Sequence, residues 1–147
     1  MRTISADIVI EATADRVWET LADFSRYVEW NPFIREAAGR AAPGERIRVH
    51  VFRDEQTANT FRPRIVVAAP GRELRWLGHV LVPGVFDGEH SFELTPVDGG
   101  TRVVQSERFS GVLVPLMGKL IEDTVERFHA LNRALKQRVE AEAVLRA

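Results

Sequence analysis

Apolar side chains recur at spacings of three and four residues along the last part of the chain, from Leu116 to Ala147. This spacing places them on one stripe of an α-helix, with charged residues on the opposite face. Pro115 stands just before the periodic run, where a missing backbone N–H costs least, and no proline or glycine interrupts the run after Gly118. We therefore predict a terminal helix of roughly 28 residues, about 42 Å long. Its apolar stripe consists of Met117, Leu120, Ile121, Thr124, Phe128, Leu131, Leu135 and Val139.

The region from Ile34 to Ser110 shows the two-residue alternation of β-strands, divided by turn signals such as Pro70-Gly71 and Asp98-Gly99-Gly100. An earlier strand is predicted from Ile4 to Ile10, followed by two short helices before Pro32, the first with Thr13 as its N-cap. Consecutive strands joined by short turns indicate an antiparallel meander, and Pro63 indicates an edge or bulged strand. We predict an α+β fold with one curved antiparallel sheet of about seven strands and helices on one face.

A helix this long needs a long partner to bury its apolar stripe, and the sheet is the only partner that the sequence offers. Where a curved sheet wraps a long helix, we expect a cavity between the two. The functional residues are therefore sought on the inward positions of the strands and on the stripe of the helix.

Composition and charge narrow the function classes. The 147 residues predict a single domain, residues 1–147, and the formal net charge of −1 gives no electrostatic footprint for nucleic acid. With no cysteine, a disulfide scaffold, a thiol nucleophile and a thiolate metal site are excluded. No window approaches the ~20 apolar residues of a membrane span. We expect a cytoplasmic monomer or homodimer without integral membrane association.

Signatures of metal or cofactor chemistry are missing from the sequence. The four histidines show no metal-ligand spacing, and there is neither a phosphate-cradling glycine loop nor a GxSxG elbow. We expect no metal and no cofactor. Several arginines alternate with inward apolar residues and with glutamates, which is typical of a solvated outer sheet face. These arginines are Arg46, Arg48, Arg62, Arg64, Arg75, Arg102 and Arg108.

The order of elements, with the long amphipathic helix last, resembles the helix-grip fold of the START-like superfamily (birch-pollen-allergen-like, also called SRPBCC). The segment Asp23–Phe33, with Trp30-Asn31-Pro32, is similar to the aromatic–Trp–Asn–Pro stretch of its bacterial polyketide cyclase/dehydrase-like branch. Further similar segments are Leu74–Gly78, Gly88–Leu94, Gly100-Thr101, Glu107–Gly111 and Asn132–Lys136. The resemblance implies a ligand-binding fold whose members include lipid and sterol carriers, hormone receptors, aromatic cyclases and co-chaperones. Fold alone does not choose among these activities.

His90 and Glu107 are the polar residues that alternation places inward on two strands joined by the Asp98–Gly100 turn. They are therefore expected to face the cavity on adjacent strands. Because a buried carboxylate without a partner is costly, we expect the imidazole of His90 to be the partner of Glu107. We expect the imidazole to gain a raised pKa and the Glu107 carboxyl a lowered one. Three roles stay open: orientation of a ligand hydroxyl or carbonyl, an acid/base dyad, and a structural pair that stiffens the wall.

Other inward positions could line the cavity or be plain core. Trp76 offers an indole N–H and Gln105 an amide. The resemblance to the helix-grip fold implies that the aromatics near Asn31 close one end of the cavity. The loop Leu113–Leu116 could form an entrance lid or a dimer contact. The complete set of ligand-binding candidates is Trp76, His90, Gln105, Glu107, Phe92, Phe109, Phe61, Trp30, Phe33, Met117, Leu120, Ile121, Thr124 and Phe128.

Three functions are consistent with these residues. The leading hypothesis is carriage or sensing of a small hydrophobic, lipid-like or aromatic ligand in the cavity. The alternative is an enzyme of the polyketide cyclase/dehydratase type, without metal or cofactor, in which His90 and Glu107 act as acid and base. The third is a protein-interaction module that uses the outer sheet face or the Leu113–Leu116 loop.

Overall fold

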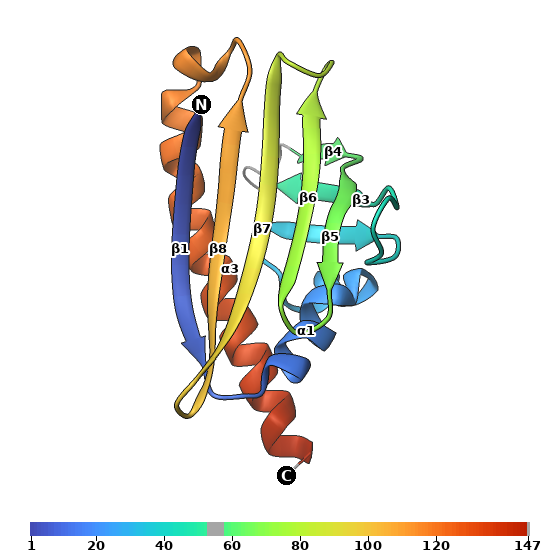
Figure 1. The fold of residues 1–147 in the computed structure, drawn as a ribbon, viewed down its shortest axis with the longest axis vertical. Coiled ribbons are helices and arrows are strands. Elements are labelled where there is room, and N and C mark those ends of the chain that lie inside the picture. Colours follow the sequence, from blue (N-terminus) through green and yellow to red (C-terminus); the bar gives the residue numbers. More distant parts are fainter. Residues whose placement is uncertain (53–57, 147) are drawn as a thin grey trace.

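A long helix, α3 (Gly118–Arg146), runs along one face of a twisted antiparallel sheet (Figure 1). The computed structural model describes residues 1–52 and 58–146, so the predicted last helical residue, Ala147, lies outside the described residues. The 29 residues of α3 confirm the length predicted from the apolar stripe. Ile121, Phe128, Leu131 and Leu135 are completely buried on that stripe. The predicted α+β helix-grip fold is confirmed.

The larger sheet has five strands in the order β1-β8-β7-β6-β5, and every neighbouring pair is antiparallel. Its order follows the predicted meander, with the first strand added beside the last. The bounds are β1 (Arg2–Ile10), β5 (Arg64–Ala69), β6 (Glu73–Val80), β7 (Phe86–Val97) and β8 (Gly100–Ser110). As predicted from Pro63, β5 is an edge strand and its register with β6 is irregular between Ile65 and Val67.

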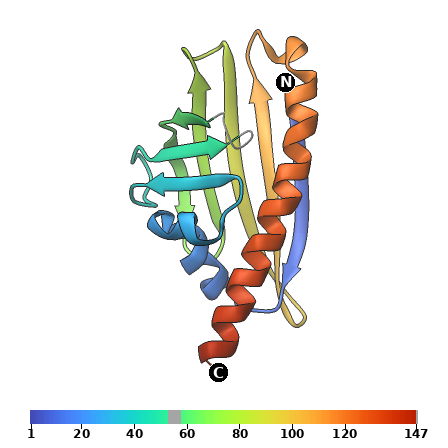
Figure 2. The same cartoon turned by 180° about the vertical axis from the view of Figure 1, so that it is seen from behind.

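A smaller sheet of three strands in the order β2-β3-β4 crosses one face of the larger one, over β5 and β6 (Figure 2). Its strands are β2 (Ile34–Ala38), β3 (Arg48–Phe52) and β4 (Ala58–Phe61). The chain leaves this sheet at Arg62 and Pro63, because proline has no N–H to continue the ladder. The sheets stay connected there, since the amide of Ile47 donates to the carbonyl of Pro63 at 2.9 Å. The described residues thus contain eight strands in two hydrogen-bonded sheets.

Short helices fill the space between β1 and β2. They are α1 (Ala14–Ala22), the 3-10 turn η1 (Phe24–Arg26) and α2 (Tyr27–Trp30). Thr13 caps α1 as predicted, its hydroxyl accepting from the amide of Arg16 at 3.3 Å. The side-chain oxygen of Asn31 accepts from the amides of Phe33 and Ile34 at 3.0 and 2.8 Å, which turns the chain into β2.

The outer face of the larger sheet carries the predicted cross-strand charge pairs. Arg75 on β6 lies 2.9 Å from Glu89 on β7, 3.5 Å from Glu93 and 3.0 Å from Glu73. Arg102 on β8 lies 3.1 Å from Asp7 on β1. These pairs occupy the sheet face opposite α3, which leaves the inner face for apolar side chains and the functional site.

Candidate functional site

A cavity of about 750 Å³ lies between the inner face of the larger sheet, the smaller sheet and α3. In Figure 2, α3 runs along the β1–β8 side while β2, β3 and β4 cover the β5–β6 side, so these parts frame the cavity from two directions. The volume is typical of small-molecule sites, which span roughly 300–1,000 Å³. Many of the lining residues are candidates from the sequence: Phe33, Phe61, Trp76, His90, Glu107, Phe109, Met117, Leu120 and Thr124.

Other candidates lie behind the cavity wall rather than on it. Phe92, Gln105, Ile121 and Phe128 are at most 1% exposed, and none of them lines the cavity. Their inward direction follows the strand alternation for Phe92 and Gln105 and the helical period for Ile121 and Phe128, but each packs into the layer between sheet and helix. They support the wall: the ring centroids of Phe92 and Phe128 are each 5.0 Å from that of His90.

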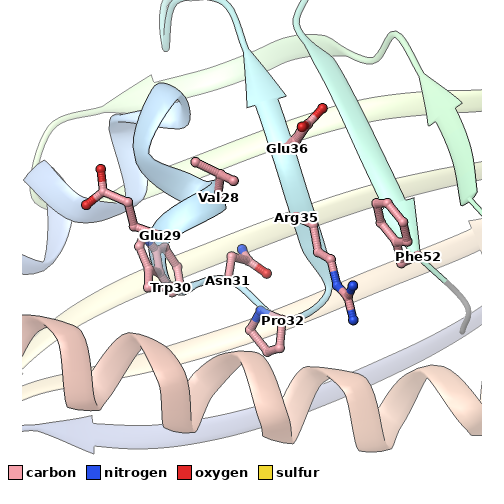
Figure 3. A pocket seen from close by; sticks show the side chains of 8 residues that line it. All are labelled: Val28, Glu29, Trp30, Asn31, Pro32, Arg35, Glu36 and Phe52. Atoms are coloured by element: carbon pink, nitrogen blue, oxygen red, sulfur yellow. The ribbon is translucent and has the colours of Figure 1, made fainter. Parts of the chain in front are cut away.

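Trp30 lies in a second, smaller hollow of about 370 Å³ at the junction of α2 and β2 (Figure 3). Its ring packs against Tyr27 with a centroid distance of 5.1 Å. Phe33, three residues on, reaches the larger cavity instead. The turn at Asn31 separates these two aromatics, so Phe33 lines the cavity and Trp30 does not.

His90 and Glu107 are direct register partners on β7 and β8, and both line the cavity, as the alternation predicts. Their closest polar atoms, His90 Nδ1 and Glu107 Oε1, are 3.9 Å apart, which is too long for a hydrogen bond. Gly88 leaves room for the carboxyl, because a Cβ at that position would stand 2.8 Å from Glu107 Oε1. The pair is adjacent but not mutually satisfied.

The predicted directions of the two pKa shifts are wrong. Burial lowers the pKa of His90 to about 4, against a smaller opposite effect of its hydrogen bond to Gln105. Burial also raises the pKa of Glu107 to about 7. Loss of water from around each group outweighs the attraction between the two, because their contact is long and the cavity wall is apolar. At neutral pH His90 is therefore uncharged, and Glu107 is divided between its acid and carboxylate forms.

The second ring nitrogen of His90 is engaged behind the wall. His90 Nε2 lies 3.0 Å from Gln105 Oε1, and the ring packs at a tilt against Trp76 and Phe128, with centroid distances of 4.9 and 5.0 Å. Gln105 in turn bonds to Asn132 on α3. Asn132 was absent from the sequence-based candidates, although it stands four residues after Phe128 and three before Leu135 on the apolar stripe. A polar residue at such a position was the signal that could have identified it.

Two glycines on the floor of the cavity were not among the sequence-based candidates. Gly78 on β6 and Gly88 on β7 are register partners and both line it. Inward glycines in adjacent strands leave space that side chains would otherwise fill, and glycine within a strand pattern is the signal for such space. His79 also contributes to the lining, and its Nδ1 lies 2.8 Å from Asp87 Oδ1.

The loop before α3 has both buried and exposed apolar residues. Leu113 lines the cavity, Val114 is buried, and Leu116 is 79% exposed. The loop therefore lies at the edge of the cavity. Its suggested roles as a lid or as a contact surface stay predictions. None of the helices among the described residues is long and apolar enough to cross a membrane.

A curved sheet that holds a long helix above a mostly apolar cavity is the architecture of the helix-grip fold. Residues 1–140 match the model of the family described as polyketide cyclase / dehydrase and lipid transport. The chain belongs to this family, which confirms the resemblance found in the sequence. It thus has the hydrophobic-ligand-binding fold of the polyketide cyclase and START type.

Solved structures agree with this assignment at the level of the fold. The ZhuI aromatase/cyclase from Streptomyces sp. R1128 is 22% identical with a TM-score of 0.77, over 97% of this chain and 95% of that one. A START superfamily protein from Mycobacterium smegmatis is 22% identical with a TM-score of 0.71, over 95% and 97%. Ara h 8.0201 is 13% identical with a TM-score of 0.74, over 95% and 98%. No curated protein matches the chain.

Proposed function

We propose that the protein binds a small hydrophobic molecule between the larger sheet and α3, as a carrier or a sensor. The observation that carries this proposal is the 750 Å³ cavity, whose wall is mostly aromatic and aliphatic with His90 and Glu107 placed together on one side. Apolar surface supplies affinity for such a ligand, and a few convergent polar groups set its orientation. Family membership and the aromatase/cyclase and START folds among its structural relatives support the same reading.

Filling the cavity from the helix side should remove binding. Met117 lines the cavity, so the larger ring in Met117→Trp is expected to occupy ligand space. We expect the affinity for the neutral fluorescent probe N-phenyl-1-naphthylamine to fall at least tenfold, equivalent to about 1.4 kcal/mol. Fluorescence titration measures the change. The matched control is Leu145→Trp, because Leu145 is 86% exposed near the end of α3. Equal binding by both variants would mean that the probe binds elsewhere.

A second candidate function is acid/base catalysis on a polyketide-like substrate. It is favoured by one observation: burial raises the pKa of Glu107 to about 7, where a carboxyl can both donate and accept a proton near neutral pH. His90, neutral and 3.9 Å away, offers a hydrogen-bond acceptor that could orient the substrate beside this carboxyl.

Turnover and affinity separate the two functions. Glu107→Gln keeps the shape of the cavity wall and removes the acidic group. If the protein is an enzyme, this substitution is expected to lower turnover of a poly-β-keto substrate by about 10²–10⁴-fold while binding persists. Product formation followed by liquid chromatography and mass spectrometry provides the measurement, with Glu126→Gln on the exposed side of α3 as the control. Binding without turnover in the wild-type protein favours the carrier or sensor.

A further inference from the structure

Two buried amide side chains connect His90 to backbone carbonyls on β1 and α3. Asn132 Nδ2 donates to the carbonyl of Ala6 at 3.1 Å. Gln105 Nε2 donates to Asn132 Oδ1 at 2.8 Å and to the carbonyl of Phe128 at 3.2 Å. Gln105 is 0% exposed and Asn132 1%, so no bulk water competes for these bonds. We call Asn132 and Gln105 together the amide chain. Both side chains hydrogen-bond to protein atoms within the buried layer.

The backbone decides which way each amide points. A carbonyl oxygen can only accept a hydrogen bond, so Ala6 requires the NH₂ group of Asn132 and Phe128 requires the NH₂ group of Gln105. Both requirements agree with the bond between the two side chains, in which Asn132 offers its oxygen. Gln105 Oε1 is thereby turned toward His90 Nε2, at 3.0 Å. An amide oxygen has no hydrogen to donate, so the hydrogen of this bond must be on Nε2.

We propose that the amide chain holds His90 in its Nε2–H form, so that the bare Nδ1 accepts a hydrogen bond from a ligand hydroxyl in the cavity. A neutral imidazole carries a single N–H, and this one is committed behind the wall. Nδ1 has no hydrogen-bond partner among the described residues and is on the Glu107 side of the ring, 3.9 Å from Oε1. The burial that keeps the ring uncharged preserves Nδ1 as an acceptor.

The geometry defines a class of ligand. An oxygen atom between Nδ1 and Glu107 can donate its hydrogen to the ring nitrogen and accept from the carboxyl in its acid form. A phenol or an alcohol satisfies both, whereas a ketone or ether oxygen leaves Nδ1 without a donor on a mostly apolar wall. The ligand is thus a hydrophobic body with a neutral hydroxyl group. This inference rests on the proposed binding function, which requires only the apolar cavity.

Two probes of the same ring system test the inference. 2-Naphthol can donate to Nδ1, whereas 2-methoxynaphthalene keeps the ring and the oxygen without a hydrogen to donate. In calorimetric titrations the wild-type protein should prefer 2-naphthol at least tenfold, equivalent to about 1.4 kcal/mol. Gln105→Met removes the acceptor for Nε2–H at similar side-chain length, and the preference should fall toward one. Ser106→Ala, the control, removes the 2.8 Å bond to Ser91 on the other sheet face and should keep the preference.

The tautomer itself is observable without any variant. Long-range ¹H–¹⁵N correlation spectra at neutral pH should show a pyrrole-type Nε2 and a pyridine-type Nδ1 for His90, assigned by its absence in His90→Asn. In Gln105→Met we expect a mixture of the two neutral tautomers. A hydrogen on Nδ1 in the wild-type protein overturns the inference. Equal affinity for the two probes also overturns it while the binding function stands. If neither these probes nor N-phenyl-1-naphthylamine bind, both proposals fall.

Discussion

Replacing Glu107 with glutamine is expected to stabilise the protein by up to about 3 kcal/mol above pH 7 and to have little such benefit near pH 4.5. Burial raises the pKa of this carboxyl from 4.5 to about 7 in the folded protein. Between these two values the folded state holds a proton that the unfolded state has lost. The free energy of unfolding therefore falls as the pH rises through this window, and the penalty is complete above pH 7. Glutamine keeps the shape and removes the charge.

Urea unfolding of the wild-type protein and Glu107→Gln at pH 5 and pH 8 measures this effect. Both proteins contain His90, so the opposite pH dependence of that residue cancels in the comparison. Glu126→Gln, an exposed glutamate on α3, serves as the control and should follow the wild-type pH dependence. If the stability gained by Glu107→Gln were the same at both pH values, the carboxyl would not be buried as described.

Phe128→Ala is expected to lower the free energy of unfolding by about 3–5 kcal/mol. Phe128 is 0% exposed, and its ring centroid lies 5.0 Å from that of His90 and 6.1 Å from that of Phe33. Its removal leaves a gap where α3 packs on the sheet, and the rings of His90 and Phe33 lose a partner on one side. The cost combines the lost burial of the ring with the cavity that remains.

Guanidinium unfolding at one fixed pH provides the measurement for Phe128→Ala. Val144→Ala is the control, because Val144 is 74% exposed on the same helix, and its effect should stay within about 0.5 kcal/mol. A loss below about 1 kcal/mol for Phe128→Ala would contradict the close packing of the Phe128 ring against His90.

The fold followed from patterns that depend on local chemistry. The apolar stripe of α3 runs for many helical turns without a proline or glycine after Gly118, and hairpin-length turns such as Asp98–Gly100 force neighbouring strands to pair. The crossing of the smaller sheet did not follow, since turn length does not say whether the next strand stays in the same sheet. Pro63 marked the break between β4 and β5 but did not indicate that the strands before and after it belong to different sheets.

The site was predicted less completely, because alternation gives the face of a strand and not the depth of a side chain. His90 and Phe92 share a face, yet only His90 lines the cavity. The helical period likewise placed Phe128 inward without showing that it is buried behind His90. The predicted pKa directions of His90 and Glu107 were wrong because the sequence shows that each has a partner of opposite charge, but not how much water each group loses on burial. Asn132 was missed because the stripe was identified by its apolar members.

The central claim is that a small hydrophobic molecule binds between the larger sheet and α3. Isotope-filtered NOE spectra of the protein with bound N-phenyl-1-naphthylamine test it most directly. We expect contacts from the probe to the Trp76 ring on the sheet side of the cavity and to the side chains of Met117 and Leu120 on the helix side. Contacts confined to exposed residues such as Val112 and Leu116 would place the probe on the surface and contradict it.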